Sequence, residues 1–580
     1  MSEAELVAQE SEEMEVVPST PEQTMETETE PETKEEPKVE ADAEKETEEE
    51  EKEPEEEKAE EEEKEPEKEK TDEEPVQPKE KRGRLSRAAK EPAKKVDTPK
   101  TDTRARQAKQ KVPEKKEEPK EETPLGKRKR TAVQQAVQTP QASAKKGKKV
   151  HSLHFEDFIT WEAGSRVLAC GEGEQLGHPG RTTSKKPRKV DVIEDENLKI
   201  VQVVAGGVHS VILAETGEVY SCGINEKGTV PAEGVEAEGS TDEYTKIVFS
   251  DELQKEGKIV MLSAGASFTA ALTNHGTVIA WGNLRDGSGK MDVHPQLIEM
   301  QKNPIIILRH KPGFSIVKIA AGENHLVMLS DDGRVFTFGD FSMGQLGRSN
   351  RLDRIRTQYI AADSESSLHV TIMDKRKKAK CKNVFAGGFW SAFLTEDDKL
   401  FVCGLNNFGH LGIAIDEPEA KDSSDDSGDD TELRILLPQF SPELSGHNWT
   451  HIEGVQHLVL RDSNGDIYCI GKNTDNALGL GSWSNSDKDK NWRYQTLQKL
   501  EIADSAGVTA QLGCSLAWNQ KGSAVAWGYD SSGQLGLGLK DDDDRVVPKP
   551  DEISSAHLEG FKIVQVSVAD NHAIFLAAKN

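Results

Sequence analysis

The sequence has few of the residues and runs on which many functions depend. Its 580 residues include six cysteines, and no two of them form a C-x-x-C pair, so a zinc site of that kind is not supported. No apolar run approaches the roughly 20 residues that a membrane-spanning helix needs. The acidic N-terminus lacks the pattern of a secretory signal, and no segment matches the phosphate-binding P-loop. We therefore expect an intracellular protein with no metal, no nucleotide cofactor and no membrane contact.

Aromatic residues are also scarce, at 5% of the chain, and they are almost missing from the first 80 residues. Residues 1–80 contain 36 Asp and Glu against 9 Lys and Arg, together with many prolines. Such a segment cannot bury enough apolar surface to offset the entropy lost on ordering. Residues 81–150 reverse the sign, with 23 Lys and Arg against 8 Asp and Glu. We predict a disordered acidic tail over 1–80 and a disordered basic arm over 81–150.

The basic arm contains three clusters of cationic residues. Short Lys/Arg clusters in a flexible segment suit importin recognition or contacts with nucleic-acid phosphates. For any single cluster, a solvated charge run is an equally good interpretation. Three clusters in one arm favour nuclear targeting, and these clusters are Lys81, Arg82 and Arg84; Lys127, Arg128, Lys129 and Arg130; and Lys145, Lys146, Lys148 and Lys149.

A hairpin pattern recurs along residues 151–580. In the copy at residues 320–347, a short apolar run over 326–329 and an aromatic-rich run over 335–338 flank an Asp-Asp-Gly turn. Glycine suits such a turn because it accepts the positive φ that tight hairpins require. Gly339, Gly344 and Gly347 then punctuate a loop. The unit therefore predicts two strands joined by a tight turn.

Two positions of this unit each recur seven times, at spacings of 52 to 67 residues. The position eight residues before the turn glycine is occupied by His209, Phe268, His325, Trp390, His457, Cys514 and His572. The glycine that closes the second strand recurs as Gly171, Gly223, Gly282, Gly339, Gly404, Gly471 and Gly528. Long periods with several short strands are typical of a β-propeller.

The two series are out of phase at the ends of the repeat region. The glycine series begins first and the histidine series ends last, so the first and last segments each contain part of one blade. Pairing these segments closes the ring and removes two exposed sheet edges. We predict an all-β fold, a seven-bladed β-propeller over 151–580 closed by its N- and C-terminal segments and preceded by a long disordered charged tail.

The cysteines and histidines fit a structural interpretation. Cys170, Cys222 and Cys403 precede the closing glycine, where other blades have Trp, Phe or Ile, which favours buried core over redox chemistry. The four histidines share one repeat position, so they belong to a ring and not to a tight metal cluster. We favour hairpin-end histidines with satisfied hydrogen bonds over metal ligands.

The hairpins lack the Trp-Asp dipeptide of WD-repeat propellers. They read Ala-Gly-x-x-His-Ser-x-x-Leu…Gly-x-Val-x-x-x-Gly, followed by Gly-x-Leu-Gly. This pattern resembles the repeat of the regulator of chromosome condensation family, which forms seven-bladed propellers. Ubiquitin ligases and photoreceptors share the repeat, so the repeat alone does not fix the activity. Residues 263–289, and residues 322–329 with 344–348, are similar to the family segments that carry a β-wedge and a face for the Ran GTPase.

The resemblance implies a chromatin-bound guanine-nucleotide exchange factor for Ran. Such a factor makes no covalent bond, because it binds the nucleotide-free GTPase best and by linkage weakens nucleotide binding by the same factor. Excess GTP then reloads the emptied site. The implied wedge, which could otherwise be an ordinary inter-strand loop, is Asn283, Leu284, Arg285, Asp286, Gly287, Ser288, Gly289 and Lys290.

The resemblance also implies residues on the propeller face. It places exchange-critical contacts at Glu323, Asn324, Arg348, and at Gln456 or its neighbour His457. It adds partner contacts at His209 and His572. The family has a carboxylate at the position of Asn324, so the adjacent Glu323 is the residue that can supply the missing charge.

Three hypotheses of function follow. The first is a monomeric nuclear exchange factor whose partners are Ran, importin and chromatin, the last through histones and DNA. It supports nuclear transport and the assembly of the mitotic spindle and nuclear envelope. The second is a non-catalytic propeller scaffold that binds chromatin or histones, which the replaced carboxylate favours. The third, a covalent enzyme such as a ubiquitin ligase, is disfavoured because the repeat continues to the last residues of the sequence.

Overall fold

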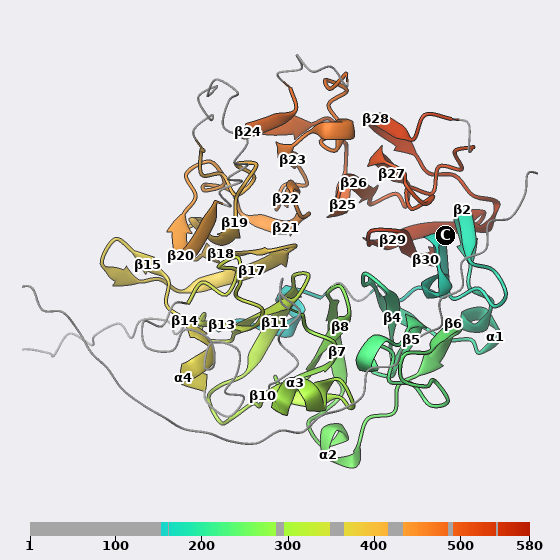
Figure 1. The fold of residues 1–580 in the computed structure, drawn as a ribbon, viewed down its shortest axis with the longest axis horizontal. Helices are drawn as coiled ribbons and strands as arrows, with labels where there is room; N and C mark the ends of the chain where they lie inside the picture. Colours follow the sequence, from blue (N-terminus) through green and yellow to red (C-terminus); the bar gives the residue numbers. More distant parts are fainter. Residues whose placement is uncertain are drawn as a thin grey trace, which may run out of the picture. The chain divides into compact units, whose positions relative to one another are not determined.

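The computed structural model describes residues 152–159, 162–285, 295–348, 365–415, 433–484, 491–540 and 543–580. The predictions for the acidic tail, for the basic arm and its three clusters, and for wedge residues Asp286 to Lys290 lie outside these residues. Within them, seven four-stranded antiparallel sheets follow one another around a ring (Figure 1). The prediction of a seven-bladed β-propeller is therefore confirmed.

Each blade contains four strands that follow one another from the centre of the ring outward. Blade 1 contains β3 (Ile200–Ala205), β4 (His209–Ala214), β5 (Val219–Ile224) and β6 (Ser240–Lys246). Blade 2 contains β7 (Ile259–Ala264), β8 (Phe268–Thr273), β9 (Val278–Gly282) and β10 (Ile305–Leu308). Blade 3 contains β11 (Ile316–Ala321), β12 (His325–Ser330), β13 (Val335–Gly339) and β14 (His369–Val370).

The remaining blades repeat this order. Blade 4 contains β17 (Cys381–Gly387), β18 (Trp390–Thr395), β19 (Leu400–Leu405) and β20 (Arg434–Phe440). Blade 5 contains β21 (Trp449–Glu453), β22 (His457–Asp462), β23 (Ile467–Lys472) and β24 (Arg493–Leu500). Blade 6 contains β25 (Ser505–Gln511), β26 (Cys514–Asn519), β27 (Ala524–Tyr529) and β28 (Val546–Glu552).

Blade 7 joins the two ends of the propeller sequence. Its strand order is β2 (Thr183–Lys189), β1 (Arg166–Glu172), β30 (His572–Lys579) and β29 (Phe561–Val568). Six residue pairs connect β1 to β30 in antiparallel register, from Arg166 opposite Ala577 to Gly171 opposite His572. The ring is thus closed by strand pairing, as the phase of the two repeat series predicts.

The two seven-member series of the sequence turn out to be cross-strand partners. In every blade the residue of the histidine series lies opposite the glycine of the glycine series, as His325 lies opposite Gly339. These glycines have φ between 98° and 116°, which side chains rarely adopt. A Cβ atom at Gly339 would lie 2.6 Å from the carbonyl oxygen of Asn324. The position therefore excludes any other residue.

Hydrogen bonds from the histidine series join neighbouring blades. His209 Nε2 lies 2.7 Å from Thr269 Oγ1 of the next blade, and His325 Nε2 lies 2.9 Å from Ser391 Oγ. His457 and His572 contact Ser515 and Ser210 in the same way. All four histidines are buried, which lowers their pKa values to about 3 or 4. We call these contacts the inter-blade histidine bonds.

The blades pack through apolar side chains, and short helices decorate their edges. Trp281, Trp390, Trp449 and Trp527 are buried among the sheets. All six cysteines are buried and unpaired, which confirms the prediction that Cys170, Cys222 and Cys403 are core residues. In the described ranges, no helix has the length and apolarity to cross a membrane. The helices are α1 (Asp191–Asp195), α2 (Asp251–Gln254), α3 (Pro295–Met300), α4 (Glu365–Leu368), and the 3-10 turns Phe155–Asp157, Glu174–Leu176, Glu226–Gly228, Thr474–Asn476 and Ala556–Leu558.

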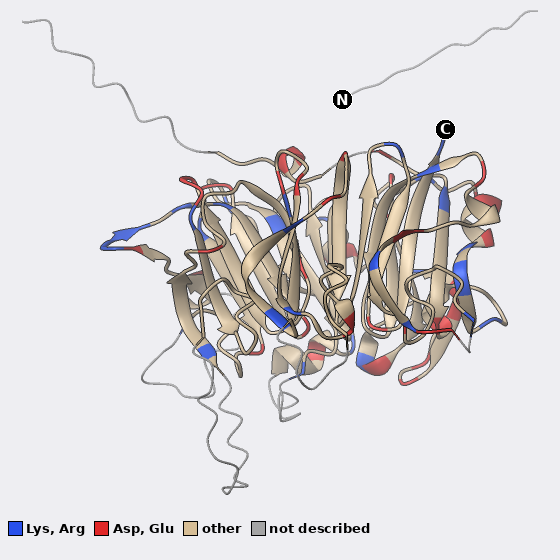
Figure 2. Cartoon of the chain, turned by 90° about the horizontal axis from the view of Figure 1, so that it is seen from above, with Lys and Arg blue, Asp and Glu red and all other residues tan. Residues whose placement is uncertain are grey.

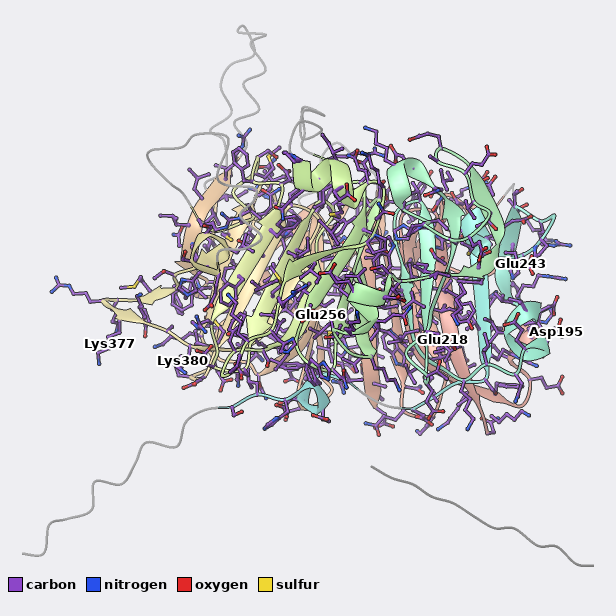
Figure 3. The ribbon with its side chains drawn as sticks, turned by 90° about the horizontal axis from the view of Figure 1, so that it is seen from below. Asp195, Glu218, Glu243, Glu256, Lys377 and Lys380 are labelled. Atoms are coloured by element: carbon purple, nitrogen blue, oxygen red, sulfur yellow. The ribbon has the colours of Figure 1, made fainter. Side chains whose placement is uncertain are left out.

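A two-stranded hairpin interrupts the connection between blades 3 and 4. It consists of β15 (Met373–Asp374) and β16 (Lys377–Lys378), with Lys375 at the turn in the left-handed conformation, φ 57°. Figures 2 and 3 show this hairpin projecting from the propeller, with its basic residues gathered along it. We call residues 373–380 the basic hairpin.

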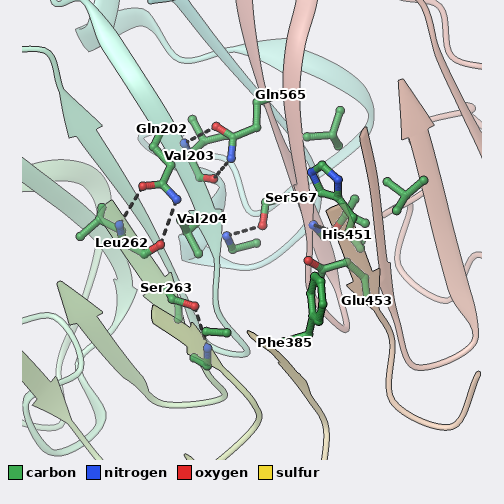
Figure 4. A pocket seen from close by; sticks show the side chains of 18 of the residues that line it. Gln202, Val203, Val204, Leu262, Ser263, Phe385, His451, Glu453, Gln565 and Ser567 are labelled. Atoms are coloured by element: carbon green, nitrogen blue, oxygen red, sulfur yellow. Dashed lines mark hydrogen bonds between the residues drawn. The ribbon is translucent and has the colours of Figure 1, made fainter. Parts of the chain in front are cut away.

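The innermost strands surround a central channel and are joined by their polar side chains. Gln565 of β29 accepts a hydrogen bond from Val203 N–H and donates one to Val203 O, while Gln202 binds the backbone of Leu262 in the same manner (Figure 4). The hydroxyls of Ser567 and Ser263 accept hydrogen bonds from the backbone N–H groups of Ala205 and Ala321, which belong to the neighbouring blades. These bonds satisfy backbone groups that would otherwise face the channel.

Candidate functional site

The two ends of the channel carry different elements. At one end, the turns between the first and second strands of the blades meet, at residues 206–208, 265–267, 322–324, 387–389, 454–456, 511–513 and 569–571; we call this end the glycine face. At the other end, the N-terminal segment 152–164 passes the channel and bonds through Leu153 N–H to Asp331 O, so we call it the N-terminal face. All the predicted exchange residues belong to strands or loops at the glycine face.

The first half of the predicted wedge is held firmly at this face. Asn283 and Leu284 are 2% and 1% exposed. Asn283 N–H donates to Ser267 O at 2.7 Å, and its side-chain oxygen accepts from Gln301 at 3.1 Å. Leu284 packs in a core cluster that also contains Leu297 of α3. The chain that leaves β9 therefore starts the predicted wedge from a fixed position.

Arg285 is the next residue, and three side chains from three blades bind it. Its backbone N–H donates to Asn324 Oδ1 at 3.0 Å. Its guanidinium pairs with the Glu226 carboxylate and lies 3.2 Å from Ser267 Oγ, which itself donates to Glu226 at 3.1 Å. We call Glu226, Ser267 and Asn324 the Arg285 anchor, because together they fix both the backbone and the charge of this residue.

Glu323 lies beside the anchor and lines the mouth of the channel. Its backbone joins three blades, since its N–H donates to Gly388 O and its carbonyl accepts from Ala266 N–H. Burial, and after it the negative charge of Asp570, raises the pKa of the Glu323 carboxyl, while the positive charge of Arg285 opposes this rise. A second carboxylate thus faces the same part of the surface as the predicted wedge.

The remaining predicted residues are not brought to this cluster. Arg348 is largely buried, which lowers its pKa to about 10, and its guanidinium donates to the side chain and carbonyl of Thr337. Gln456, in blade 5, accepts a hydrogen bond from Lys472 at 2.8 Å. These two side chains occupy separate parts of the glycine face.

His209, His457 and His572 are the predicted site residues that the fold uses internally. Each is buried and makes an inter-blade histidine bond. A buried ring cannot touch a docked protein directly, so a role for these histidines at the face is indirect, through the placement of the turns beside them. Within the described residues, no group of three or more His, Cys, Asp or Glu could hold a metal ion.

Sequence reasoning did not find two features of the surface. Glu226 and Ser267 precede Arg285 by 59 and 18 residues, and only the contact between blades 1 and 2 brings them to it. The basic hairpin exposes Lys375, Arg376, Lys377 and Lys378, for which the described part of the chain provides no ion pair. The run Lys-Arg-Lys-Lys was visible in the sequence, but nothing local distinguishes it from a solvated loop.

Comparisons with known proteins agree with this architecture. The family profile described as the RCC1-like domain matches residues 166–575. The chain belongs to the RCC1-like domain family. The human regulator of chromosome condensation is 30% identical over 421 residues, which cover 71% of this chain and 90% of that protein. The guanine nucleotide exchange factor SRM1 of Saccharomyces cerevisiae is 26% identical over 451 residues, covering 72% of this chain and 86% of that protein.

Two solved structures share the fold. Yeast RCC1 (Prp20) bound to Kap60 has a TM-score of 0.62 with 22% identity, over 77% of this chain and 97% of that one. Prp20p from Saccharomyces cerevisiae, in a study of its binding to Gsp1p and histones, has a TM-score of 0.60 with 23% identity, over 74% of this chain and 96% of that one. At these identities the structures establish the RCC1-like propeller and no more.

Proposed function

We propose that this RCC1-like protein is a nuclear exchange factor that promotes GDP release and GTP loading on the Ran GTPase at chromatin. The Arg285 anchor is the observation that carries the proposal. An exchange factor must hold a rigid projection against the nucleotide site of its partner, because a projection that yields cannot distort that site. The buried residues Asn283 and Leu284, and the three-way grip on Arg285, provide such a support.

In this mechanism Asn324 and Glu323 together take the place of the family's carboxylate. Asn324 positions the wedge through the backbone of Arg285, which a neutral amide oxygen does as well as a carboxylate. Glu323 supplies the negative charge beside it, at the mouth of the channel. Binding of the nucleotide-free GTPase to this surface weakens the affinity for the nucleotide by the same factor, and no covalent step is required.

The basic hairpin supports the chromatin part of the proposal. Four consecutive exposed cations on a projecting turn are suited to phosphate oxygens, whose contacts release counterions and strengthen binding at low salt. Residues 81–150, with their Lys/Arg clusters, are proposed to add DNA phosphate contacts and importin recognition, and residues 1–80 to weaken the DNA contacts electrostatically.

One alternative has an observation in its favour. A chromatin-binding propeller without exchange activity needs the basic hairpin and does not need a carboxylate at position 324. It predicts binding to nucleosomes or histones with no effect on nucleotide release.

The deciding experiment measures release of fluorescent GDP from purified Ran in the presence of the full chain. We expect strong acceleration, which Glu323→Ala combined with Asn324→Ala removes. The control Asp466→Asn changes a half-exposed carboxylate of blade 5 that pairs with Lys499, and it should preserve the acceleration. Absence of acceleration together with absence of Ran binding would establish the scaffold as the better description.

A further inference from the structure

The central channel contains a carboxylate, that of Glu453, which forms no hydrogen bond and no ion pair with the described residues. The channel has a volume of about 780 Å³ and is lined by all seven innermost strands, which is within the range of ligand pockets. Glu453, at the end of β21, lies deep in the protein, and the part of its surface that stays accessible faces the channel. Figure 4 shows its carboxylate pointing into this space. In the described residues it has no hydrogen bond and no ion pair.

Several other polar side chains of the channel wall have hydrogen-bond partners within the protein. Lys318 donates to Asn383 Oδ1 at 2.6 Å, and its ammonium lies over the rings of Phe385 at 4.6 Å and Phe158 at 5.4 Å. Arg461 binds Ser505 O and Thr450 Oγ1. Two glutamines and two serines of the wall bond to the backbone of the adjacent blade, namely Gln202, Gln565, Ser263 and Ser567. Among these described groups, the carboxylate of Glu453 has neither a hydrogen bond nor an ion pair, although the charge of Lys318 acts on it.

The charges around Glu453 favour a cationic ligand. Burial raises the pKa of Glu453 to about 7, and the positive charge of Lys318 is the opposing influence. Burial leaves His451 uncharged near neutral pH by lowering its pKa to about 3. At the glycine face, Glu323 lines the mouth of the channel, and the negative charge of exposed Asp570 contributes to raising the pKa of Glu323. A carboxylate held away from bulk water without a partner is costly, and a cation that enters would remove that cost.

Access to the carboxylate is from the glycine face. At the N-terminal face, residues 156–159 line the channel and Phe158 contacts Lys318. At the glycine face the mouth is bounded by small residues, including Gly206, Gly265, Gly322 and Gly387. A long, thin group can pass such a mouth, whereas a folded element cannot.

We propose that the central channel binds a lysine or arginine side chain of an extended peptide, which enters from the glycine face and pairs with Glu453. This site is distinct from the proposed wedge, because Glu453 belongs to blade 5 and the Arg285 anchor to blades 1 to 3. Two sources have this chemistry. One is the basic arm of this chain, residues 81–150, and the other is a basic tail of a partner protein.

The test measures binding of a fluorescein-labelled acetyl-Gly-Gly-Arg-Gly-Gly peptide to the full chain by anisotropy. A peptide with Gln in place of Arg reports binding that does not depend on the cation. We expect Glu453→Gln to weaken the arginine peptide at least tenfold. Asp466→Asn, which removes a half-exposed carboxylate from the same blade, should leave the affinity unchanged. The thermal midpoint of each variant verifies that the ring is folded.

A second arm distinguishes the two sources. Replacing Lys127, Arg128, Lys129 and Arg130 with Ala makes the arginine peptide bind more tightly if the arm occupies the channel, and has no effect if the natural ligand is a partner's tail. In both cases Glu453→Gln must lower the affinity of the protein for the arginine peptide. Equal affinity of Glu453→Gln and the unchanged chain, in both backgrounds, would overturn the proposal.

A photo-crosslinking measurement removes dependence on any variant. A peptide carrying diazirine-lysine in place of arginine is irradiated with the full chain, and the adducts are located by mass spectrometry. We expect adducts on β17, β21 or β29, whose residues line the channel. Adducts confined to residues 1–80 or to the outer strands would mean that the peptide binds only the acidic exterior, and the proposal would be wrong.

Discussion

The Arg285 anchor and the wall of the central channel both enclose charged side chains, but they differ in the hydrogen-bond and ion-pair partners that they offer to those side chains. At the anchor, the backbone N–H of Arg285 is bonded to Asn324, and its guanidinium is bonded to Glu226 and Ser267. In the channel, Lys318 donates to Asn383 and acts on Glu453 through its charge, and the described residues provide the Glu453 carboxylate with no hydrogen bond and no ion pair. A fully hydrogen-bonded network fixes the positions of its side chains, whereas a buried charge without a partner can still bind a group of opposite charge. We therefore connect the first region with positioning and the second with binding.

The largest expected effect comes from the glycine that supports the anchor. Gly339→Ala would place a Cβ atom 2.6 Å from Asn324 O, at a backbone φ of 109°. We expect a loss of about 3 kcal/mol or more of unfolding free energy, from backbone strain and displacement of the Asn324 turn. Chemical denaturation would measure it. Gly313→Ala is the matched control, because its φ is also positive but its Cβ would meet no atom within 4 Å; equal losses in the two variants would contradict the steric argument.

The next effect tests the anchor without disturbing the fold. Glu226→Ala removes the acid that pairs with Arg285, and the wedge loses part of its support. We expect the second-order rate constant of GDP release from Ran to fall about 30-fold, as misplaced catalytic elements commonly cause. Stopped-flow fluorescence would measure this. The control Glu218→Ala changes a glutamate of the same blade that pairs with Lys246 (Figure 3), and a similar loss there would show that the effect is not specific to the anchor.

A third, intermediate effect concerns pH. Burial lowers the pKa of His325 to about 3, below the roughly 6.5 of an unfolded histidine. Between these values the unfolded chain binds the proton and the folded ring does not, so stability is present above pH 6.5 and is lost as the pH falls. From pH 7 to pH 5 this amounts to about 2 kcal/mol for one such histidine.

Thermal unfolding at pH 7 and pH 5 measures this loss. His325→Gln can still bond to Ser391, so we expect the variant to be less sensitive to acid than the unchanged chain. His154, an exposed histidine, provides the control substitution to Gln. If His325→Gln and His154→Gln show the same acid sensitivity as the unchanged chain, the inter-blade histidine bonds do not govern acid stability.

The smallest effect separates the anchor from the basic hairpin. Replacing Lys375, Arg376 and Lys377 with Ala removes three exposed cations. We expect DNA affinity to fall about tenfold at moderate salt and the slope of log K against log salt to decrease by about 2.7, because each phosphate contact contributes about 0.9. Release of GDP from Ran should not change. An unaltered salt slope in a fluorescence titration would exclude the hairpin from DNA binding.

Much of the fold could be predicted from the sequence because the same hairpin pattern recurs seven times along the chain. The positions of His325 and Gly339 recur, and their pairing follows from hairpin geometry alone. The ring closure could be predicted from the phase of the two series. The burial of Cys170, Cys222 and Cys403 could be predicted because large apolar residues occupy the same repeat position in the other blades.

The site could be predicted only in part, because its contacts cross between blades. That residues 283–285 begin a loop is a local property, but the approach of Glu226 to Arg285 depends on how two sheets pack. Likewise, the sequence shows Glu453 as one polar residue near the end of a strand. Only the arrangement of seven strands reveals that it faces a channel and that Lys318 is occupied elsewhere. Residues Asp286 to Lys290 remain a sequence prediction.

The pairing of β1 with β30 has a consequence for the way the protein is made. Its two strands are separated by some 400 residues, so blade 7 cannot form until nearly all of the propeller sequence has left the ribosome. Blades 1 to 6 can fold in order as they are synthesised, each from contiguous chain. Until the last strands arrive, the free edge of β1 and the apolar face of blade 6 that packs against blade 7 stay unprotected. We expect ribosome-bound intermediates of this protein to depend on chaperones up to that final step.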